Sequence, residues 1–102
     1  MNRGEIYDAA VPGGTHPAVI VTRDRAIPHL RNVCVVAITS VVRGLPTEVP
    51  LDTANGLARD CVANCDNLFT IPKRALDRRR GALGPGQLRR LNDALRIALD
   101  LD

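Results

Sequence analysis

The sequence has 102 residues and a net charge of +3, and we expect residues 1–102 to fold as one domain. Apolar residues make up 45% of it and charged residues 25%, and no stretch approaches the roughly 18 apolar residues of a membrane-spanning helix. Thirteen of the 14 basic residues are arginine, which suits phosphate, although codon bias could produce the same composition. A basic surface favours a polyanionic partner.

Short strands separated by polar loops are predicted over the first two thirds of the chain. The segment before the second strand contains Pro12-Gly13-Gly14, a loop signal, and Asp24–Arg31 is broken by Pro28 and reads as a loop or a single helical turn. Ser40–Pro46 is a further loop, and Asn55-Gly56 is a turn signal. The predicted strands are Arg3–Val11, Pro17–Thr22, Val33–Thr39, Thr47–Leu51, Cys61–Ala63 and Leu68–Ile71.

The C-terminal segment predicts an amphipathic helix. It begins at Gly84-Pro85, because proline is tolerated in the first turn, and its leucines recur every three or four residues from Leu88 to Leu99. Short strands followed by one helix favour a mainly β fold with helices (α+β), a small antiparallel barrel. A parallel sheet is the weaker alternative, because the loops are too short for crossover helices.

The three cysteines are Cys34, Cys61 and Cys65, and no apolar leader is evident near Met1. We therefore expect a cytoplasmic protein with reduced thiols. The spacing of Cys61 and Cys65 is not that of a zinc site, so a structural role is expected for them.

The sequence contains no phosphate-binding loop, nucleophile elbow or zinc motif, so candidate catalytic residues must be sought singly. His16 is the first of these candidates. It precedes Pro17, where a loop enters a buried strand, and catalytic side chains favour such junctions. The alternative is an exposed loop histidine. The acidic residues form no cluster suited to a metal, so an enzyme here would use acid–base chemistry without metal or cofactor.

Hydroxyl groups and arginines near strand ends are further candidates. Thr39 and Ser40 end the strongest strand and can donate to a phosphate oxygen, or Thr39 can simply cap the strand. Arg23 and Arg25 follow the second strand and could bind phosphate or form surface salt bridges. The run Arg78–Arg80 is expected to be a solvated surface or to bind a partner's acidic segment.

Five short motifs and a closing helix follow one another along the chain: Arg3–Tyr7, His16–Asp24, Val35–Ser40, Pro46–Val49, Asp66–Ile71 and the helix ending at Leu99-Asp100-Leu101. Their order resembles the MazF/PemK toxin family over essentially its whole length. That resemblance implies an SH3-like barrel, a homodimer, cleavage of single-stranded RNA at short sequences, and an antitoxin partner that blocks the RNA groove. From the net charge and the resemblance together, we expect that antitoxin to have an acidic C-terminal segment.

The resemblance also assigns roles to single residues. Thr39 matches the strand-end threonine that contacts the scissile phosphate, and Asp66-Asn67 matches an acidic residue followed by Gln or Asn near the RNA path. His16 departs from the family, which usually has its main catalytic arginine directly before this proline. A histidine can exchange protons near neutrality, whereas arginine mainly stabilises charge, so the electrostatic role passes to another cation, for which Arg23 is the candidate.

The sequence therefore predicts the toxin of a type II toxin–antitoxin system, a metal-independent, sequence-specific endoribonuclease. We expect His16, Thr39 and Arg23 to be catalytic, and Arg25 and Ser40 to bind RNA together with Arg43, Asp66 and Asn67. The alternative is a non-enzymatic toxin of the same barrel fold that binds and poisons DNA gyrase.

Overall fold

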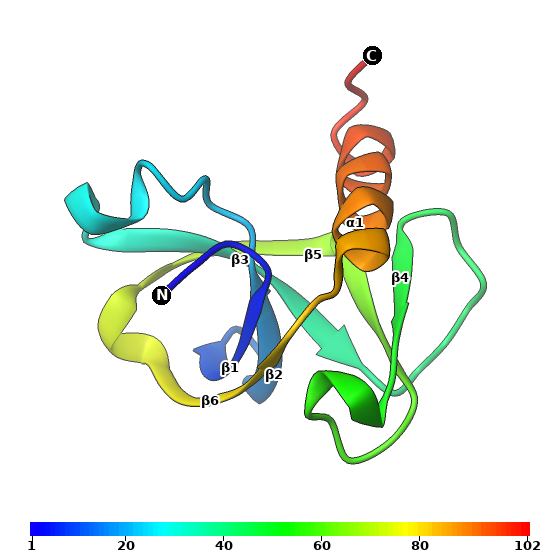
Figure 1. Cartoon of the computed structure of the whole chain (residues 1–102), viewed down its shortest axis with the longest axis horizontal. Coiled ribbons are helices and arrows are strands. Elements are labelled where there is room, and N and C mark those ends of the chain that lie inside the picture. The colour runs from blue at the N-terminus through cyan, green and yellow to red at the C-terminus, as the bar shows by residue number, and fades with distance from the viewer.

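Six antiparallel strands form one sheet that curls into a half-barrel, followed by a single helix (Figure 1). The computed structural model describes all 102 residues. The sheet order is β4-β5-β3-β2-β1-β6. The strands are β1 (Glu5–Val11), β2 (Gly14–Ile20), β3 (Asn32–Thr39), β4 (Glu48–Leu51), β5 (Cys61–Pro72) and β6 (Leu76–Ala82). The predicted fold, a small and mainly β barrel with a C-terminal helix, is confirmed.

The helix α1 (Pro85–Ala98) begins where Gly84-Pro85 predicted it. The side chain of Gln87 accepts the Gly84 N–H at 2.8 Å, which satisfies one of the free donors of the first turn. Leu91 is fully buried against the sheet, and α1 packs beside β4 and β5 (Figure 1). No helix of the structure is long and apolar enough to cross a membrane.

Both faces of the central strands are buried. Val19 of β2 and Val36 of β3 belong to one hydrophobic cluster, which also includes Leu91. Their neighbours Ile20 and Val35 belong to a second cluster on the other face. Side chains alternate between faces along a strand, so burial on both sides explains why β2 and β3 were predicted from continuous apolar runs rather than from an alternating pattern.

The turn before β2 is tighter than the sequence suggested. Pro12 and Gly13 alone connect β1 to β2, and Val11 pairs with Gly14 across the turn. Gly13 has φ +96°, a backbone conformation that glycine adopts at little cost. His16 therefore lies within β2, opposite Ala9, and not in a loop as predicted.

β5 is one continuous strand, whereas two short strands, Cys61–Ala63 and Leu68–Ile71, were predicted. The polar segment between them stays in the sheet because Asn64 pairs with Glu48 of β4, and the Asn64 Oδ1 accepts the Asp66 N–H at 3.0 Å. The pairing with β3 shifts register at this point, so β5 bends without ending.

β6 was not predicted, because its central residues are three arginines with no apolar alternation. It pairs with β1 at one edge of the sheet, and Arg78 and Arg79 are exposed there. Charged side chains suit an edge strand, since they discourage further strand pairing. The predicted solvated surface is confirmed for these two arginines, whereas Arg80 is partly buried.

Two glycines allow the segment after β4 to lie directly on β6. This segment contains the 3-10 helix η2 (Thr53–Asn55), and Gly56 follows it with φ +86°. A Cβ atom on Gly56 would overlap the carbonyl oxygen of Arg80, and one on Gly81 would overlap that of Asn55. The Asn55 side chain also donates to the Ala82 carbonyl at 3.0 Å, so the contact is held by hydrogen bonds.

Gly81→Ala should lower the free energy of unfolding by about 1–3 kcal/mol, the usual cost of forcing extra atoms into a packed interior. Chemical denaturation with a circular dichroism readout would measure it. Gly86→Ala is the matched control, since a Cβ there meets only the end of the Arg89 side chain at 3.8 Å and the change should be neutral or stabilising. Equal stability of the two variants would contradict the backbone contact.

Candidate active site

The pairing of β2 with β3 stops short of the β1–β2 turn. The last pair toward the turn is Ala18 with Ala37, and the next residue, Pro17, has no N–H to donate. Two hollows open beside the separated strands, with volumes of about 280 Å³ and 210 Å³. His16, Ile38 and Thr39 line both hollows, so the sheet brings His16 and Thr39 together as predicted.

We call the larger of the two the arginine hollow, because it combines an apolar floor with basic and hydroxyl-bearing side chains. Its floor includes Ile38 of β3 and Leu57 of the segment after η2. The polar side chains that line it are His16, Thr39, Ser40, Arg59 and Arg80. Cations and hydroxyl donors converging on one small hollow can bind an anionic group such as a phosphate.

Arg80 reaches the arginine hollow from β6 and is held on one side. Its Nη1 lies 3.3 and 3.4 Å from the two carboxylate oxygens of Asp8 on β1. Its Nε donates to the Gly56 carbonyl at 3.3 Å. The glycine contact described above thus also orients a guanidinium group toward the hollow.

The smaller hollow, which we call the Phe69 hollow, has a different character. Asn67 and Phe69 of β5 line it, together with Val11 and Pro12 at the β1–β2 turn. Phe69 is the only phenylalanine in the chain, and its ring is partly exposed. An amide beside an aromatic ring can hydrogen-bond and stack against a base.

Asp66 lies next to Asn67 but lines neither hollow. One of its carboxylate oxygens accepts a hydrogen bond from the buried Thr47 hydroxyl at 2.7 Å. Its backbone N–H donates to the side chain of Asn64, so hydrogen bonds hold both the backbone and the side chain of Asp66. The structure therefore places it as a residue that orders β5 beside Asn67.

The loop after Thr39 is organised around a buried carboxylate. Glu48 is 3% exposed, and its carboxylate accepts the backbone N–H groups of Arg43, Gly44 and Leu45 at 2.8–3.2 Å. These bonds hold the second half of the loop against the first residue of β4. The Arg43 side chain is exposed and lines neither hollow.

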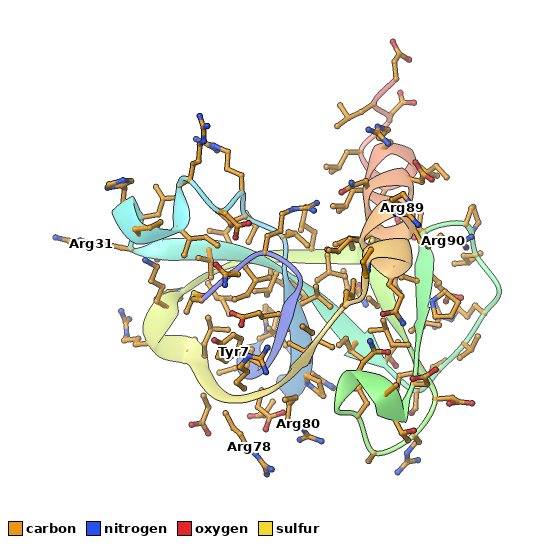
Figure 2. The ribbon with its side chains drawn as sticks, viewed as in Figure 1. Tyr7, Arg31, Arg78, Arg80, Arg89 and Arg90 are labelled. Atoms are coloured by element: carbon orange, nitrogen blue, oxygen red, sulfur yellow. The ribbon has the colours of Figure 1, made fainter.

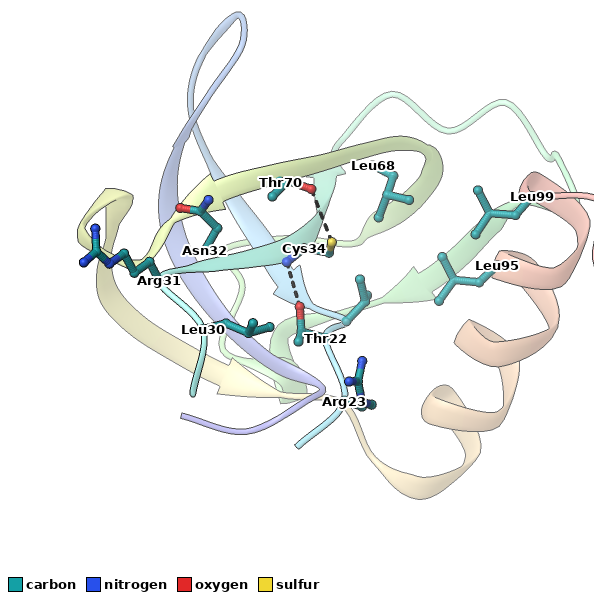
Figure 3. A pocket seen from close by; sticks show the side chains of 11 residues that line it. Thr22, Arg23, Leu30, Arg31, Asn32, Cys34, Leu68, Thr70, Leu95 and Leu99 are labelled. Carbon is teal, nitrogen blue, oxygen red and sulfur yellow. Dashed lines mark hydrogen bonds between the residues drawn. The ribbon is translucent and has the colours of Figure 1, made fainter. Parts of the chain in front are cut away.

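The structure does not bring Arg23 to His16. Arg23 lines a separate hollow of about 570 Å³ near the other end of β2, which is also lined by Leu30, by Leu95 of α1 and by Leu99 just after α1 (Figure 3). The strand between the two residues carries them to opposite ends of the sheet. Arg25 is exposed on the loop that follows and lines no hollow.

The two arginines that do join His16 were not identified from the sequence. Arg80 belongs to the basic run of β6, and Arg59 lies in a polar segment predicted only as a turn region. The arginines are spread widely over the surface, with Arg31 before β3 and Arg89 on α1 (Figure 2). Because so many look alike in the sequence, only the fold distinguishes those beside His16.

Ion pairs divide the basic run of β6 into residues with different surroundings. Arg79 Nε lies 2.9 Å from Glu5, and Arg80 pairs with Asp8, whereas Arg78 makes no ion pair. Burial acts to raise the pKa of Glu5, but the Arg79 hydrogen bond and the nearby N-terminus outweigh it and lower the pKa overall. Glu5 therefore stays ionised and keeps Arg79 beside β1.

No three side chains of His, Cys, Asp or Glu lie close enough together to hold a metal ion. The cysteines are free, and Cys61 lines the arginine hollow with its thiol donating to the Arg59 carbonyl at 3.3 Å.

The curled antiparallel sheet, its C-terminal helix and the basic hollow beside the open ladder define a small half-barrel with a basic site. The PemK-like, MazF-like toxin family of type II toxin-antitoxin systems matches residues 2–99, and the chain belongs to this family.

Named relatives come from Mycobacterium tuberculosis. Endoribonuclease MazF3 is 49% identical over 86 residues, covering 84% of each chain. Probable endoribonuclease MazF2 is 41% identical over 99 residues, covering 96% of this chain and 97% of its own. Among solved structures, the Mycobacterium tuberculosis toxin MazF-mt6 superposes with a TM-score of 0.91 at 45% identity, covering 96% of this chain and 98% of its own.

Another solved structure is an endoribonuclease in complex with its cognate antitoxin from a mycobacterial species. It superposes with a TM-score of 0.90 at 30% identity and covers 100% of this chain and 97% of its own. The structural likeness therefore extends over the whole chain.

Cys65 should resist alkylation far longer than Cys61 in the folded protein. Burial and then the neighbouring Asp66 charge raise the pKa of the Cys65 thiol to about 11, so it stays protonated at pH 8 while the thiolate is the reactive form. Mass spectrometry after timed treatment with iodoacetamide would measure this. In denaturant the two cysteines should react alike, and equal rates in the folded protein would show that Cys65 is accessible.

Proposed function

We propose that this chain is the toxin of a type II toxin–antitoxin system and acts as an endoribonuclease on single-stranded RNA. The observation that carries the proposal is that His16 and Thr39 line both the arginine hollow and the Phe69 hollow. MazF3 is named an endoribonuclease and MazF2 a probable endoribonuclease, and nothing in the site favours the gyrase-poisoning alternative. An RNA target would place its action in the cytoplasm.

The proposed reaction uses the substrate's own 2′-hydroxyl as the nucleophile. Its oxygen forms a bond to phosphorus while the bond from phosphorus to the 5′-oxygen breaks, leaving a 2′,3′-cyclic phosphate and a 5′-hydroxyl. The 2′-hydroxyl loses a proton and the 5′-oxygen gains one, and a histidine beside the phosphate can perform either transfer. Thr39 would donate a hydrogen bond to a phosphate oxygen. Because the substrate supplies the nucleophile and side chains supply the proton transfer and the hydrogen bond to phosphate, we propose that no metal or cofactor takes part.

RNA-binding roles follow from the two hollows. We propose that Ser40 assists Thr39 and that Asn67 contacts a base in the Phe69 hollow, with Asp66 holding Asn67 in place. Arg25 and Arg43 are exposed outside the hollows, so we propose for them only a general attraction for the RNA backbone.

We also propose a cognate antitoxin with an acidic C-terminal segment, and a homodimer. A complex of a relative with its antitoxin supports such a partner, and the basic hollow suits an acidic segment. The homodimer would cover apolar side chains of the C-terminal region that the single chain leaves exposed, Ile97, Leu99 and Leu101.

His16→Ala should lower the cleavage rate by roughly 10²–10⁴-fold, the range for losing a general acid or base. Thr39→Ala should cost less, because it removes one hydrogen bond to an anion, about 1.5–3 kcal/mol. Cleavage of an end-labelled RNA in EDTA would measure both, and the wild-type rate should not need added metal.

His16→Arg should keep activity and lose pH dependence between about pH 5 and 8, since arginine stays charged.

His29→Ala is the matched control, since His29 is exposed in η1 (Ile27–His29) and lines neither hollow. Arg23→Ala should also leave the rate near that of the wild type, because Arg23 is remote from His16. A silent His16→Ala variant together with a severe Arg23→Ala variant would locate the chemistry elsewhere.

The cognate antitoxin should compete with RNA for the arginine hollow, and its affinity should fall as salt concentration rises. Titration of the antitoxin against the protein and a fluorescent RNA, at several salt concentrations, would measure this. Simultaneous binding of RNA and antitoxin would contradict a shared site.

A further inference from the structure

A histidine at position 16 leaves the site in need of a separate cation. Cleavage of a phosphodiester passes through a more negatively charged phosphorus centre, and positioned positive charge stabilises it and anchors the RNA backbone. The arginine hollow contains two guanidinium groups, those of Arg59 and Arg80, in the same lining as His16 and Thr39.

We propose that Arg80, with Arg59 at the rim, forms a subsite for one backbone phosphate of the RNA, and that Asp8 is its positioning residue. This inference rests on the proposed endoribonuclease function and assigns the cation that the function requires. It replaces Arg23, which lies in a different hollow.

Arg80 is pre-positioned for this role. Its Nη1 and Nε atoms face Asp8 and the Gly56 carbonyl, while its Nη2 makes no hydrogen bond within the chain. Its side chain is 25% exposed, so the free edge of the guanidinium can meet a ligand. A guanidinium group that is already oriented loses less conformational entropy when it binds phosphate.

The ion pair with Asp8 orients the guanidinium group of Arg80 but is too long to be a strong hydrogen bond. The two N···O distances, 3.3 and 3.4 Å, exceed the roughly 2.7–2.9 Å of a strong charge-assisted hydrogen bond. Asp8 lies on β1 opposite Pro17, one residue from the strand pair that contains His16. The same strand pairing therefore sets the positions of the histidine and of the partner that holds the arginine.

Arg59 completes the subsite from the other wall. Its side chain is exposed, and none of the ion pairs of the structure involves it. It lies two residues before β5, in the segment that the glycine contact presses against β6. Two guanidinium groups from separate segments can thus approach one phosphate.

The test is a cycle of protein and substrate changes. The cleavage site is first mapped on a long RNA, and a fluorescent oligonucleotide is then made with a 2′-deoxy nucleotide at that site, so that binding is measured without cleavage. A series of such oligonucleotides replaces one phosphate at a time by an uncharged methylphosphonate. Each is titrated by fluorescence polarisation against wild type, Arg80→Gln, Arg80→Lys, Asp8→Asn and Arg78→Gln.

We expect Arg80→Gln to weaken binding by roughly 10–100-fold, with Arg80→Lys intermediate because it keeps charge without the planar fork. One methylphosphonate should weaken wild-type binding and have little further effect on Arg80→Gln, which identifies the contacted phosphate. Asp8→Asn should preserve sensitivity to that methylphosphonate while weakening binding less. Arg78→Gln removes the same charge from an exposed neighbour on β6, and it should change affinity little and keep the full pattern of sensitivity.

Equal sensitivity of Arg80→Gln and wild type at every phosphate would overturn the subsite, even if the wild type cuts RNA. Absence of cleavage of any RNA by the wild type would overturn the proposed function and the subsite together. Thermal unfolding of each variant separates loss of binding from loss of fold. If Arg80→Gln does not fold, Arg80→Lys decides: a folded Arg80→Lys variant with wild-type affinity would contradict a role for the guanidinium group.

Discussion

The approach of two backbones at Gly56 and Gly81 is the constraint on which the rest of the structure depends. The sheet is a half-barrel with β4 at one edge and β6 at the other, and no strand pairing joins these edges. The segment after β4 crosses instead to β6, where any side chain at either glycine would collide with backbone. Asn55 secures the crossing through hydrogen bonds to Ala82 and to Gln87 of α1. Sheet, crossing segment and helix are therefore fixed as one unit.

The site follows from this closure and from a second local feature, the proline in β2. Pro17 leaves the ladder between β2 and β3 open near the β1–β2 turn, which exposes His16 and Thr39 to both hollows. The closure then supplies the opposite wall with Arg59 and Arg80. An open ladder alone would leave a shallow gap between two strands, whereas the crossing segment turns it into a hollow that can enclose a phosphate.

The order of apolar residues predicted β2, β3 and α1 because the buried positions of these elements are occupied by apolar side chains at regular spacings. β6 gives no such pattern, since pairing with β1 and backbone contact with the segment after β4 hold this arginine-rich edge strand without an alternating apolar face. His16 and Thr39 could be proposed from the sequence because the loop signal before Pro17 and the end of the strongest strand mark them, and the structure brings the two side chains to the same hollows. That Arg80 and not Arg23 lines the hollow with His16 could not be predicted, because it depends on register shifts in the pairing of β1 with β6 and on the glycine contact, which join distant parts of the chain.

The position of β6 in the chain has a consequence for synthesis. A chain emerges from the ribosome N-terminus first, so His16, Thr39 and Arg59 are available before the strand that carries Arg80. Until that strand is made, the crossing segment has no backbone to lie on and α1 does not yet exist to cover the core. The nascent chain thus carries an unfinished hollow while it is still beside its own message, and the hollow is completed only after β6 has been made.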